Sequence, residues 1–167
     1  MVAEREEVQL TEEREDVQYN KQRKRNEMEI VFDAVSCNES FARVAVAAFI
    51  THLNPTLEEL ADIKTAVSEA VSNSVIHGYR GGEGTIYMEC EYSAEGRVRI
   101  CIRDEGVGIP DVEQAMEPLY TTNTDGERSG MGFTVMESFT DRLTVKSEPG
   151  KGTDVVMIKK LDIGYAE

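Results

Sequence analysis

The clearest periodic pattern in the chain is helical and runs over residues 57–77. At about 100° per residue, its apolar side chains gather on one half of the helix, whereas Glu69, Asn73 and His77 fall within about 80° of one another on the other half. The apolar positions are Leu60, Ile63, Val67, Ala70, Val71 and Val75. The apolar half is expected to pack on a core, which leaves the polar half for water or for a bound ligand.

Strands are predicted where apolar and polar residues alternate with a period of two. The first predicted strand carries the alternating residues Met28, Ile30, Phe32 and Ala34. Segments 85–92 and 97–103 also alternate and are joined by the turn sequence SAEG, so they form a predicted hairpin. The segments LTVKS and TDVVMIK, joined across EPGKG, form a second predicted hairpin.

An earlier helix is expected over about residues 38–53. Capping-box sequences precede both helices, namely Ser36-x-x-Glu39 and Thr56-x-x-Glu59, in which a hydroxyl and a carboxylate satisfy amide groups of the first turn. The glycine-rich sequence RGGEG ends the second helix, because glycine accepts the left-handed conformation that is common at helix ends.

The order of these elements predicts an α/β fold. A strand is followed by two helices, a hairpin, an irregular stretch with a short helix, a helix over residues 130–139 and a second hairpin. This order favours a two-layer sandwich, in which helices cover one face of a mixed, mostly antiparallel sheet. The globular domain is expected over residues 26–167. Residues 1–25 are dominated by charge and hold few apolar anchors, so they are expected to be a disordered tail or a frayed helix.

A formal charge of −14 narrows the classes of partner. Nucleic acids and anionic membranes both attract clusters of Lys and Arg, so neither is expected, whereas a basic protein or a ligand accompanied by a cation fits. Three cysteines, Cys37, Cys90 and Cys101, lack the spacing of a zinc site and are expected to be reduced core thiols. The longest apolar run, residues 44–50, is too short to span a bilayer, so a cytoplasmic protein is expected.

Three glycine-rich stretches are more polar than simple connections require. DEGVGIPD places Asp104 just before Gly106 and Gly108, which let the backbone turn sharply against a ligand. ERSGMGF places Gly130 and Gly132 at a helix start, where unpaired amide groups favour phosphate. GKGT closes the second hairpin. Each stretch alone also fits an ordinary turn, and the polar helix face also fits a solvated surface, but independent turns have no reason to follow one another in this order.

In this order, the helix with Glu69 and Asn73, DEGVGIP, SGMGF and GKGT resemble the ATP-binding module shared by DNA gyrase, the Hsp90 chaperone, histidine kinases and MutL. The resemblance covers about residues 27–160. Closer still, four segments resemble the anti-sigma factor F family of spore-forming bacteria: RNEMEIVFDAVSCNESFARVAVAAFITHLNPT, IKTAVSEAVSNSVIHGY, RDEGVGIPD and ERSGMGFTVMESF. This resemblance implies a serine kinase that also holds a sigma factor inactive.

The resemblance implies a nucleotide site along the polar half of the second helix. Glu69 would orient and deprotonate the attacking serine hydroxyl, and Asn73 would hold Mg²⁺ against the phosphates of ATP through its side-chain oxygen. Asp104 would accept a hydrogen bond from the adenine amino group, and Thr153 would complete this contact through water. His77 is expected to have a structural or surface role instead.

The resemblance also implies a flexible lid over the triphosphate at residues 116–132. The further residues implied to contact the nucleotide are Gly106, Gly108, Thr121, Thr122, Arg128, Ser129, Gly130, Met131 and Gly132. Where the family's lid usually shows TTK, this chain has Asn123 after two threonines, so a lysine contact to phosphate is lost or supplied elsewhere. The tail before Asn26 also extends beyond the family's usual start.

The implied partners are a sigma factor and an anti-anti-sigma protein that carries the phosphorylated serine. Glu39 and Arg43 would contact both, although their spacing alone predicts a surface ion pair on one helix. Phe41 and Val44, between and beside them, are expected to point into the core. A homodimer is also implied.

Two alternative functions stay open: a stress-response anti-sigma kinase with different partners, and a nucleotide-gated binding module without phosphotransfer. A histidine kinase fits less well, because the chain shows no dimerisation helix bearing a phosphoacceptor histidine, and gyrase or Hsp90 would need a transducer domain. Glu69 separates the kinase from the passive module, since a carboxylate beside phosphate is costly unless it accepts the proton.

Overall fold

The computed structural model describes residues 25–118 and 131–163. In chain order the elements are β1 (Arg25–Asp33), α2 (Cys37–Phe49), a 3₁₀ turn (Ile50–Leu53), α3 (Leu57–Asn73), a π-helical turn (Ser74–Gly78), β2 (Thr85–Ser93), β3 (Arg97–Asp104), α4 (Val112–Ala115), α5 (Gly132–Phe139), β4 (Arg142–Glu148) and β5 (Gly152–Lys160). The predicted strand, the helices and the two hairpins are all present.

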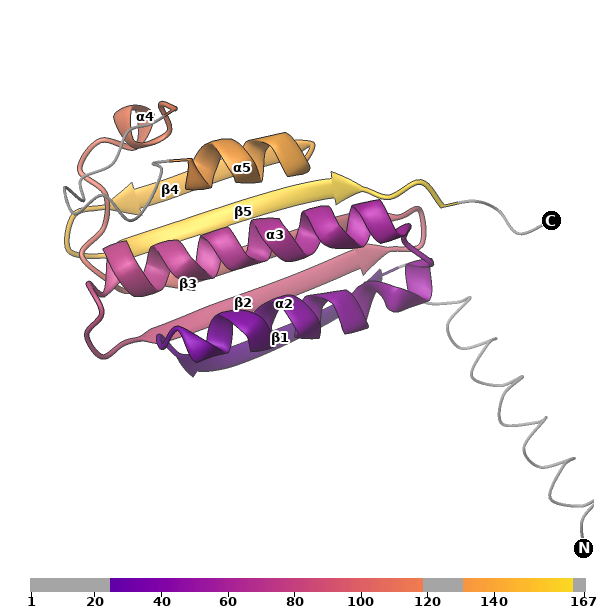
Figure 1. The fold of residues 1–167 in the computed structure, drawn as a ribbon, viewed down its shortest axis with the longest axis horizontal. Coiled ribbons are helices and arrows are strands. Elements are labelled where there is room, and N and C mark those ends of the chain that lie inside the picture. Colours follow the sequence, from indigo (N-terminus) through magenta and orange to yellow (C-terminus); the bar gives the residue numbers. More distant parts are fainter. Residues whose placement is uncertain (1–24, 119–130, 164–167) are drawn as a thin grey trace, which may run out of the picture.

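The strands form a five-stranded sheet in the order β1-β2-β3-β5-β4, and neighbours pair antiparallel. Figure 1 shows α2, α3 and α5 side by side across one face of this sheet. The structure therefore confirms the two-layer α/β fold. Within the described strands the sheet is antiparallel throughout rather than mostly so.

Helix α3 lies at the centre of the helical layer and supplies much of the core. The predicted apolar positions that are buried are Ile63, Val67, Ala70, Val71 and Val75. Leu60 is partly buried against the same cluster. Opposite them, alternate residues of β2 and β3 are buried, including Ile86, Met88, Ile100 and Ile102. The apolar half of α3 therefore packs on the sheet as predicted.

Only one of the two predicted capping boxes forms. At the start of α3, Thr56 Oγ1 accepts from Glu59 N at 3.1 Å, and Glu59 Oε2 accepts from Thr56 N at 2.8 Å. At the start of α2, Ser36 has helical dihedral angles and makes no side-chain cap. The carboxylate of Glu39 instead accepts a hydrogen bond from Ser72 Oγ on α3 at 2.8 Å. A tertiary contact between helices has replaced the local one.

Two expectations about α2 are wrong. Phe41 and Val44 do not enter the core, because their side chains are 49% and 56% exposed; α2 packs inward through Ala42 and Val46. Cys37, at the first turn of α2, is also exposed and is not a core thiol. The outer surface of α2 is therefore more apolar than the sequence suggested.

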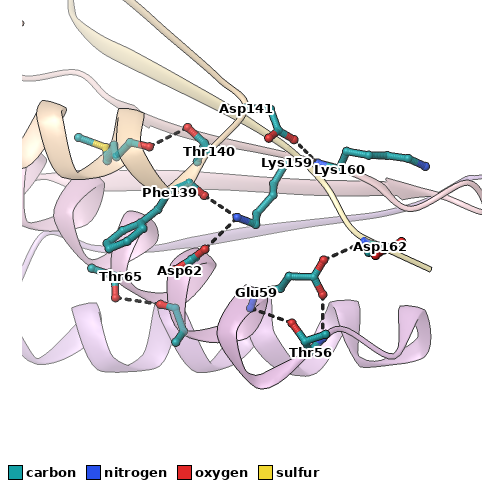
Figure 2. A network of polar contacts seen from close by, with 12 residues as sticks. Thr56, Glu59, Asp62, Thr65, Phe139, Thr140, Asp141, Lys159, Lys160 and Asp162 are labelled. Atoms are coloured by element: carbon teal, nitrogen blue, oxygen red, sulfur yellow. Dashed lines mark hydrogen bonds and ion pairs between the residues drawn. The ribbon is translucent and has the colours of Figure 1, made fainter. Parts of the chain in front are cut away.

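At the end of the sheet reached by the C-terminus of β5, Lys159 joins three elements. Its ammonium group lies 2.9 Å from Asp62 Oδ2 on α3 and 3.0 Å from the carbonyl oxygen of Phe139, the last residue of α5 (Figure 2). Nearby, Glu59 Oε1 accepts from the backbone amide of Asp162 at 2.8 Å (Figure 2). These contacts fix the start of α3 and the end of α5 against β5.

Candidate active site

Asp104 is the last residue of β3, and its side chain faces the helical layer with only 3% exposure. Its Oδ2 accepts from Ser74 Oγ at 2.8 Å and its Oδ1 accepts from Gly106 N at 3.0 Å. Burial raises the pKa of Asp104, and hydrogen bonds from Ser74 and from the backbone of Gly106 and Thr153 partly oppose that rise. The residue is a buried acceptor, as required of the predicted adenine contact.

A π-helical turn brings Ser74 to Asp104. The α-helical part of α3 ends at Asn73, and the next turn is wider, with Tyr79 N donating to Ser74 O at 2.9 Å. Such turns are rare and frequently mark functional sites. The helix predicted to residue 77 therefore changes its geometry at residue 74, and His77 lies half-buried in the wider turn. Sequence reasoning missed Ser74, whose only signal is its place directly after Asn73.

The loop after β3 folds back tightly on its surroundings, and this explains its glycines. A Cβ atom on Gly106 would lie 2.2 Å from the carbonyl oxygen of Gly78. Gly108 has φ of +71°, and a Cβ there would lie 2.0 Å from the carbonyl oxygen of Glu148. The backbone amide of Val107 donates to Gly78 O at 2.9 Å, so the loop is fastened to the π turn. These glycines permit the backbone to approach other backbone segments closely, and their predicted approach to a ligand stays a prediction.

Tyr79 is a second residue that sequence reasoning missed. Its hydroxyl group donates to the carbonyl oxygen of Thr85 at 2.5 Å and accepts from the backbone amide of Glu105 at 2.8 Å. It therefore ties the residue after Asp104 to the start of β2. An aromatic residue just beyond a helix end gave no signal for this bridging role.

A polar row crosses three strands beside Asp104. Asp104 is paired in register with Thr153 on β5, which is paired with Ser147 on β4. Since paired residues share one face of a sheet, all three side chains lie on the face that the helices cover. Ser147 Oγ lies 2.8 Å from Thr153 Oγ1. The structure thus brings Thr153 next to Asp104 as predicted, and it adds Ser147.

Glu69, Asn73 and Gly132 also lie together. A Cβ atom on Gly132 would be 3.2 Å from both Glu69 Oε2 and Asn73 Oδ1. The start of α5 therefore lies against the polar half of α3, and both side chains are half-buried. This places a carboxylate and an amide oxygen beside the first amide groups of a helix, where phosphate is favoured.

The donor set around Asn73 suits Mg²⁺ held jointly with phosphate. The described part of the chain contains no group of three His, Cys, Asp or Glu side chains that could form a metal site of its own. Mg²⁺ needs no such cage, since it usually binds through one or two protein oxygens together with substrate phosphates. Asn73 Oδ1, a hard oxygen donor beside Glu69, fits this requirement.

The two buried cysteines are unsuited to thiol chemistry. Burial raises the pKa of Cys90 to about 12, and burial also raises that of Cys101, so neither thiol is an activated nucleophile. Within residues 25–118 and 131–163, no helix has the length and apolar character needed to cross a bilayer.

The predicted lid residues Thr121, Thr122, Arg128, Ser129 and Gly130 lie outside the described residues, as does Asn123. Only the two ends of this segment are described. Met116, directly after α4, donates from its backbone amide to Val112 O at 3.0 Å, and the carbonyl oxygen of Met131, directly before α5, accepts from Val135 N at 2.8 Å.

The residues predicted to bind partners, Glu39 and Arg43, lie on the neighbouring helix α2 and not among the site residues. Glu39 is bound by Ser72, and the Arg43 guanidinium donates to Ser40 Oγ at 3.3 Å. The ion pair that their spacing predicts is absent from the salt bridges of the described residues. Arg43 is half-buried beside the exposed Phe41 and Val44.

Comparison with known proteins agrees with this geometry. The family model described as histidine kinase-like ATPase domain matches residues 37–159. An anti-sigma F factor from Clostridium beijerinckii is 58% identical over 139 residues, covering 83% of this chain and 96% of that protein. An anti-sigma F factor from Oceanobacillus iheyensis is 56% identical over 138 residues, covering 82% of this chain and 94% of that protein.

Solved structures support the fold. The RsbU and RsbW domains of a Mycobacterium tuberculosis protein superpose with a TM-score of 0.58 at 20% identity, covering 81% of this chain and 32% of that larger one. The mycobacterial sensor histidine kinase MprB superposes with a TM-score of 0.51 at 14% identity, covering 82% of this chain and 100% of that one.

Proposed function

The chain belongs to the histidine kinase-like ATPase domains and, among them, to the anti-sigma F factor family, and from this premise we propose that it is a serine kinase that controls a sigma factor. An ATP-using kinase domain and an anti-sigma role follow from the family. The proposal adds the substrate: a serine hydroxyl on an anti-anti-sigma protein, whose phosphorylation inactivates that protein.

One observation carries the proposal: a buried acceptor, Asp104, meets the turn that follows α3, and a proton acceptor, Glu69, lies about one turn before the end of that helix. Asp104 lies at Ser74, where it would bind the adenine amino group, and Thr153 lies beside it. Along the same helix, Glu69 and Asn73 face the start of α5. Asn73 would hold Mg²⁺ against the phosphates, and Glu69 would take the proton of the attacking serine. The Mg²⁺ ion would neutralise charge on the transferred phosphoryl group.

The residues of the neighbouring loops complete the proposed nucleotide site. Gly106 and Gly108 shape the loop behind the base, and Met131 and Gly132 bring backbone amides to the phosphates. From the family resemblance we assign the remaining phosphate contacts to Thr121, Thr122, Arg128, Ser129 and Gly130.

The proposed partners are a sigma factor, the anti-anti-sigma substrate and a second copy of the chain. Glu39 and Arg43 would contact the first two, which would make their binding mutually exclusive. The exposed Phe41 and Val44 support a protein contact there, because large apolar side chains are common in interfaces. Since sigma factors act in transcription, the proposed function is cytoplasmic.

A thermal-shift experiment tests the proposed nucleotide site. Mg-ATP at about 100 times its Kd should add roughly 2.7 kcal/mol to the stability of the wild-type chain. Asp104→Asn should lose most of this shift, whereas Asp154→Asn, a matched change on the opposite face of the adjacent strand, should keep it. A full shift in Asp104→Asn would show that this carboxylate does not bind adenine.

Phosphotransfer is tested separately by mixing the chain with Mg-ATP and purified candidate anti-anti-sigma proteins. Phosphoserine in one of them is the expected result. If ATP binds but no candidate is phosphorylated, the nucleotide-gated binding module becomes the better description of the chain.

A further inference from the structure

Ser147 has no role in the function described so far, yet its hydroxyl oxygen lies within hydrogen-bonding distance of several polar atoms beside the site. It lies on β4, one strand beyond Thr153 and two beyond Asp104, in the polar row on the helix-covered face. Its oxygen has three neighbours: Ile109 N at 2.7 Å, Gly152 O at 2.8 Å and Thr153 Oγ1 at 2.8 Å. The hydrogen bonding of this group decides what Thr153 can offer a ligand.

A serine hydroxyl has one proton to donate and two lone pairs that accept. Ile109 N carries a proton, so it donates and occupies one lone pair of Ser147. Gly152 O is a carbonyl oxygen, so it must receive the single proton of Ser147. The contact with Thr153 can then form only if Thr153 donates to the remaining lone pair of Ser147.

Thr153 is therefore left with lone pairs alone on the side facing Asp104. Asp104 is also an acceptor, because its carboxylate oxygens accept hydrogen bonds from Ser74 Oγ and from Gly106 N. The two neighbouring side chains thus present acceptors and no donor. A water molecule bound to Asp104 and Thr153 would donate one hydrogen bond to each of them. Towards the nucleotide base it could then only accept a hydrogen bond.

We propose that Ser147 is a specificity-determining residue that fixes Thr153 as an acceptor, so that the site takes 6-aminopurine nucleotides and rejects 6-oxopurine nucleotides. This inference rests on the proposed adenine-binding role of Asp104 and Thr153. An amino group at purine position 6 donates to such a site. A carbonyl oxygen at that position would face acceptors only, and leaving buried polar groups unmatched is costly.

The test compares the affinities of the full chain for ATP and for ITP by calorimetry with Mg²⁺ present. The two bases differ in the 6-substituent and in the proton that N1 of the 6-oxopurine carries. Wild type should bind ATP at least about tenfold more tightly than ITP. Ser147→Ala releases the Thr153 proton, which can then turn toward a carbonyl oxygen. The ATP-to-ITP preference should fall at least about threefold, chiefly through tighter ITP binding. Ser147→Thr keeps the hydroxyl group and should keep the preference.

Ser138→Ala is the matched control, since it removes an exposed hydroxyl on α5 that donates within its own helix, to Thr134 O. Should Ser147→Ala fail to fold, Ser147→Cys removes the strong hydrogen bonds at nearly constant volume and gives the same readout. A preference unchanged in a folded variant that binds ATP normally would overturn the role of Ser147. A wild type with no ATP preference, or Asp104→Asn binding ATP normally, would contradict the proposed adenine site itself.

Discussion

At the scale of single residues, ligand binding and burial have opposite effects on the ionisation of Asp104. Binding an amino group calls for an ionised acceptor, but burial at 3% exposure raises its pKa and disfavours the ionised form. Donors from Ser74 and Gly106 offset part of this cost, since a carboxylate accepts stronger hydrogen bonds than a neutral acid. The site therefore depends on a π turn that delivers one hydroxyl group to the right oxygen.

The raised pKa predicts that acid weakens nucleotide binding without weakening the fold through this group. The folded chain holds a proton on Asp104 at pH values where the unfolded chain has lost it. Protonation of Asp104 thus favours the folded state: its stabilising contribution is present at low pH and is lost as the pH rises through the raised pKa. Protonation also weakens the acceptor, so affinity should fall as the pH is lowered from neutral through the raised pKa of Asp104.

Adenosine is the suitable ligand for this pH titration, because it has no phosphate that titrates. The affinity of the wild-type chain for adenosine, followed by ligand-observed NMR, should decline as the pH is lowered. The melting temperature of the ligand-free Asp104→Asn variant, measured over the same pH values, shows how titration of the other groups changes the stability of the fold. An adenosine affinity that stays flat over this range would contradict the assignment of Asp104.

A second residue-scale prediction separates chemistry from binding. Glu69→Gln keeps the shape of the side chain beside Gly132 but removes the proton acceptor. Phosphotransfer should slow by about 10²–10⁴, while ATP affinity stays within a few-fold of wild type. Single-turnover transfer to the substrate protein and calorimetric ATP titration measure the two effects. Unchanged transfer would give Glu69 a structural role.

At the scale of elements, α5 links the candidate site to a polar network at the other end of the sheet. Its first residue, Gly132, lies beside Glu69 and Asn73, and its last carbonyl group, on Phe139, accepts from Lys159 (Figure 2). The Lys159 side chain is only 15% exposed and Asp62 only 22%, so this contact is well shielded from water. Lys159 is therefore expected to fix the position of α5 along α3.

Lys159→Met tests this anchoring role. The change leaves the Asp62 carboxylate and the Phe139 carbonyl oxygen without their donor, which should cost about 1–3 kcal/mol of stability in urea unfolding. Because α5 is released from its distant anchor, the KM for ATP should rise more than kcat falls. Lys160→Met, which removes the neighbouring exposed ammonium group, is the control and should change both quantities little. Equal stability of the two variants would argue against anchoring.

Helices and strands were predicted correctly from the sequence wherever their residues follow one clear hydrophobic period. The apolar half of α3 and the alternating residues of the two hairpins were predicted correctly, because burial of one face is what selects those patterns. The failures are of another kind. Ser36-x-x-Glu39 has a capping sequence, but Glu39 found a partner 33 positions away on α3. A local rule cannot anticipate a hydrogen bond made by tertiary packing.

The candidate site divides in the same way. Glu69, Asn73, Asp104 and Thr153 were predicted from the family resemblance of the motifs that hold them, and the structure brings Asp104 next to Thr153 and Glu69 next to Asn73. Ser74, Tyr79 and Ser147 could not be predicted: the first depends on a π turn, the second on a hydroxyl bridge between loops, and the third on strand register. Each of these roles depends on where two distant segments meet, which no single stretch of sequence encodes.

At the scale of the whole molecule, the nucleotide site and the proposed partner surface occupy different elements. The outer surface of α2 carries Arg43 with the exposed side chains of Phe41 and Val44, and Phe41 packs edge-on against Phe32 of the edge strand β1 at 6.1 Å. Aromatic residues and arginine are enriched at the centres of protein interfaces, so the exposed Phe41 and the neighbouring Arg43 suit a protein contact. Partner capture can therefore be altered without touching the ATP site.

Arg43→Glu tests this separation. Among the described residues, Arg43 donates a hydrogen bond to Ser40 of its own helix, so its replacement should leave the melting temperature and ATP affinity nearly unchanged. Binding to both the sigma factor and the anti-anti-sigma protein should weaken by at least about 2 kcal/mol, as expected of an arginine at an interface centre. Arg142→Glu, the same exchange at an exposed position on the opposite edge strand β4, should leave both affinities intact. Calorimetry with each purified partner measures the effect.

If both affinities are unchanged in Arg43→Glu, the α2 surface is not the shared partner site. If only one is lost, the two partners bind different surfaces, and their mutual exclusion would need another cause.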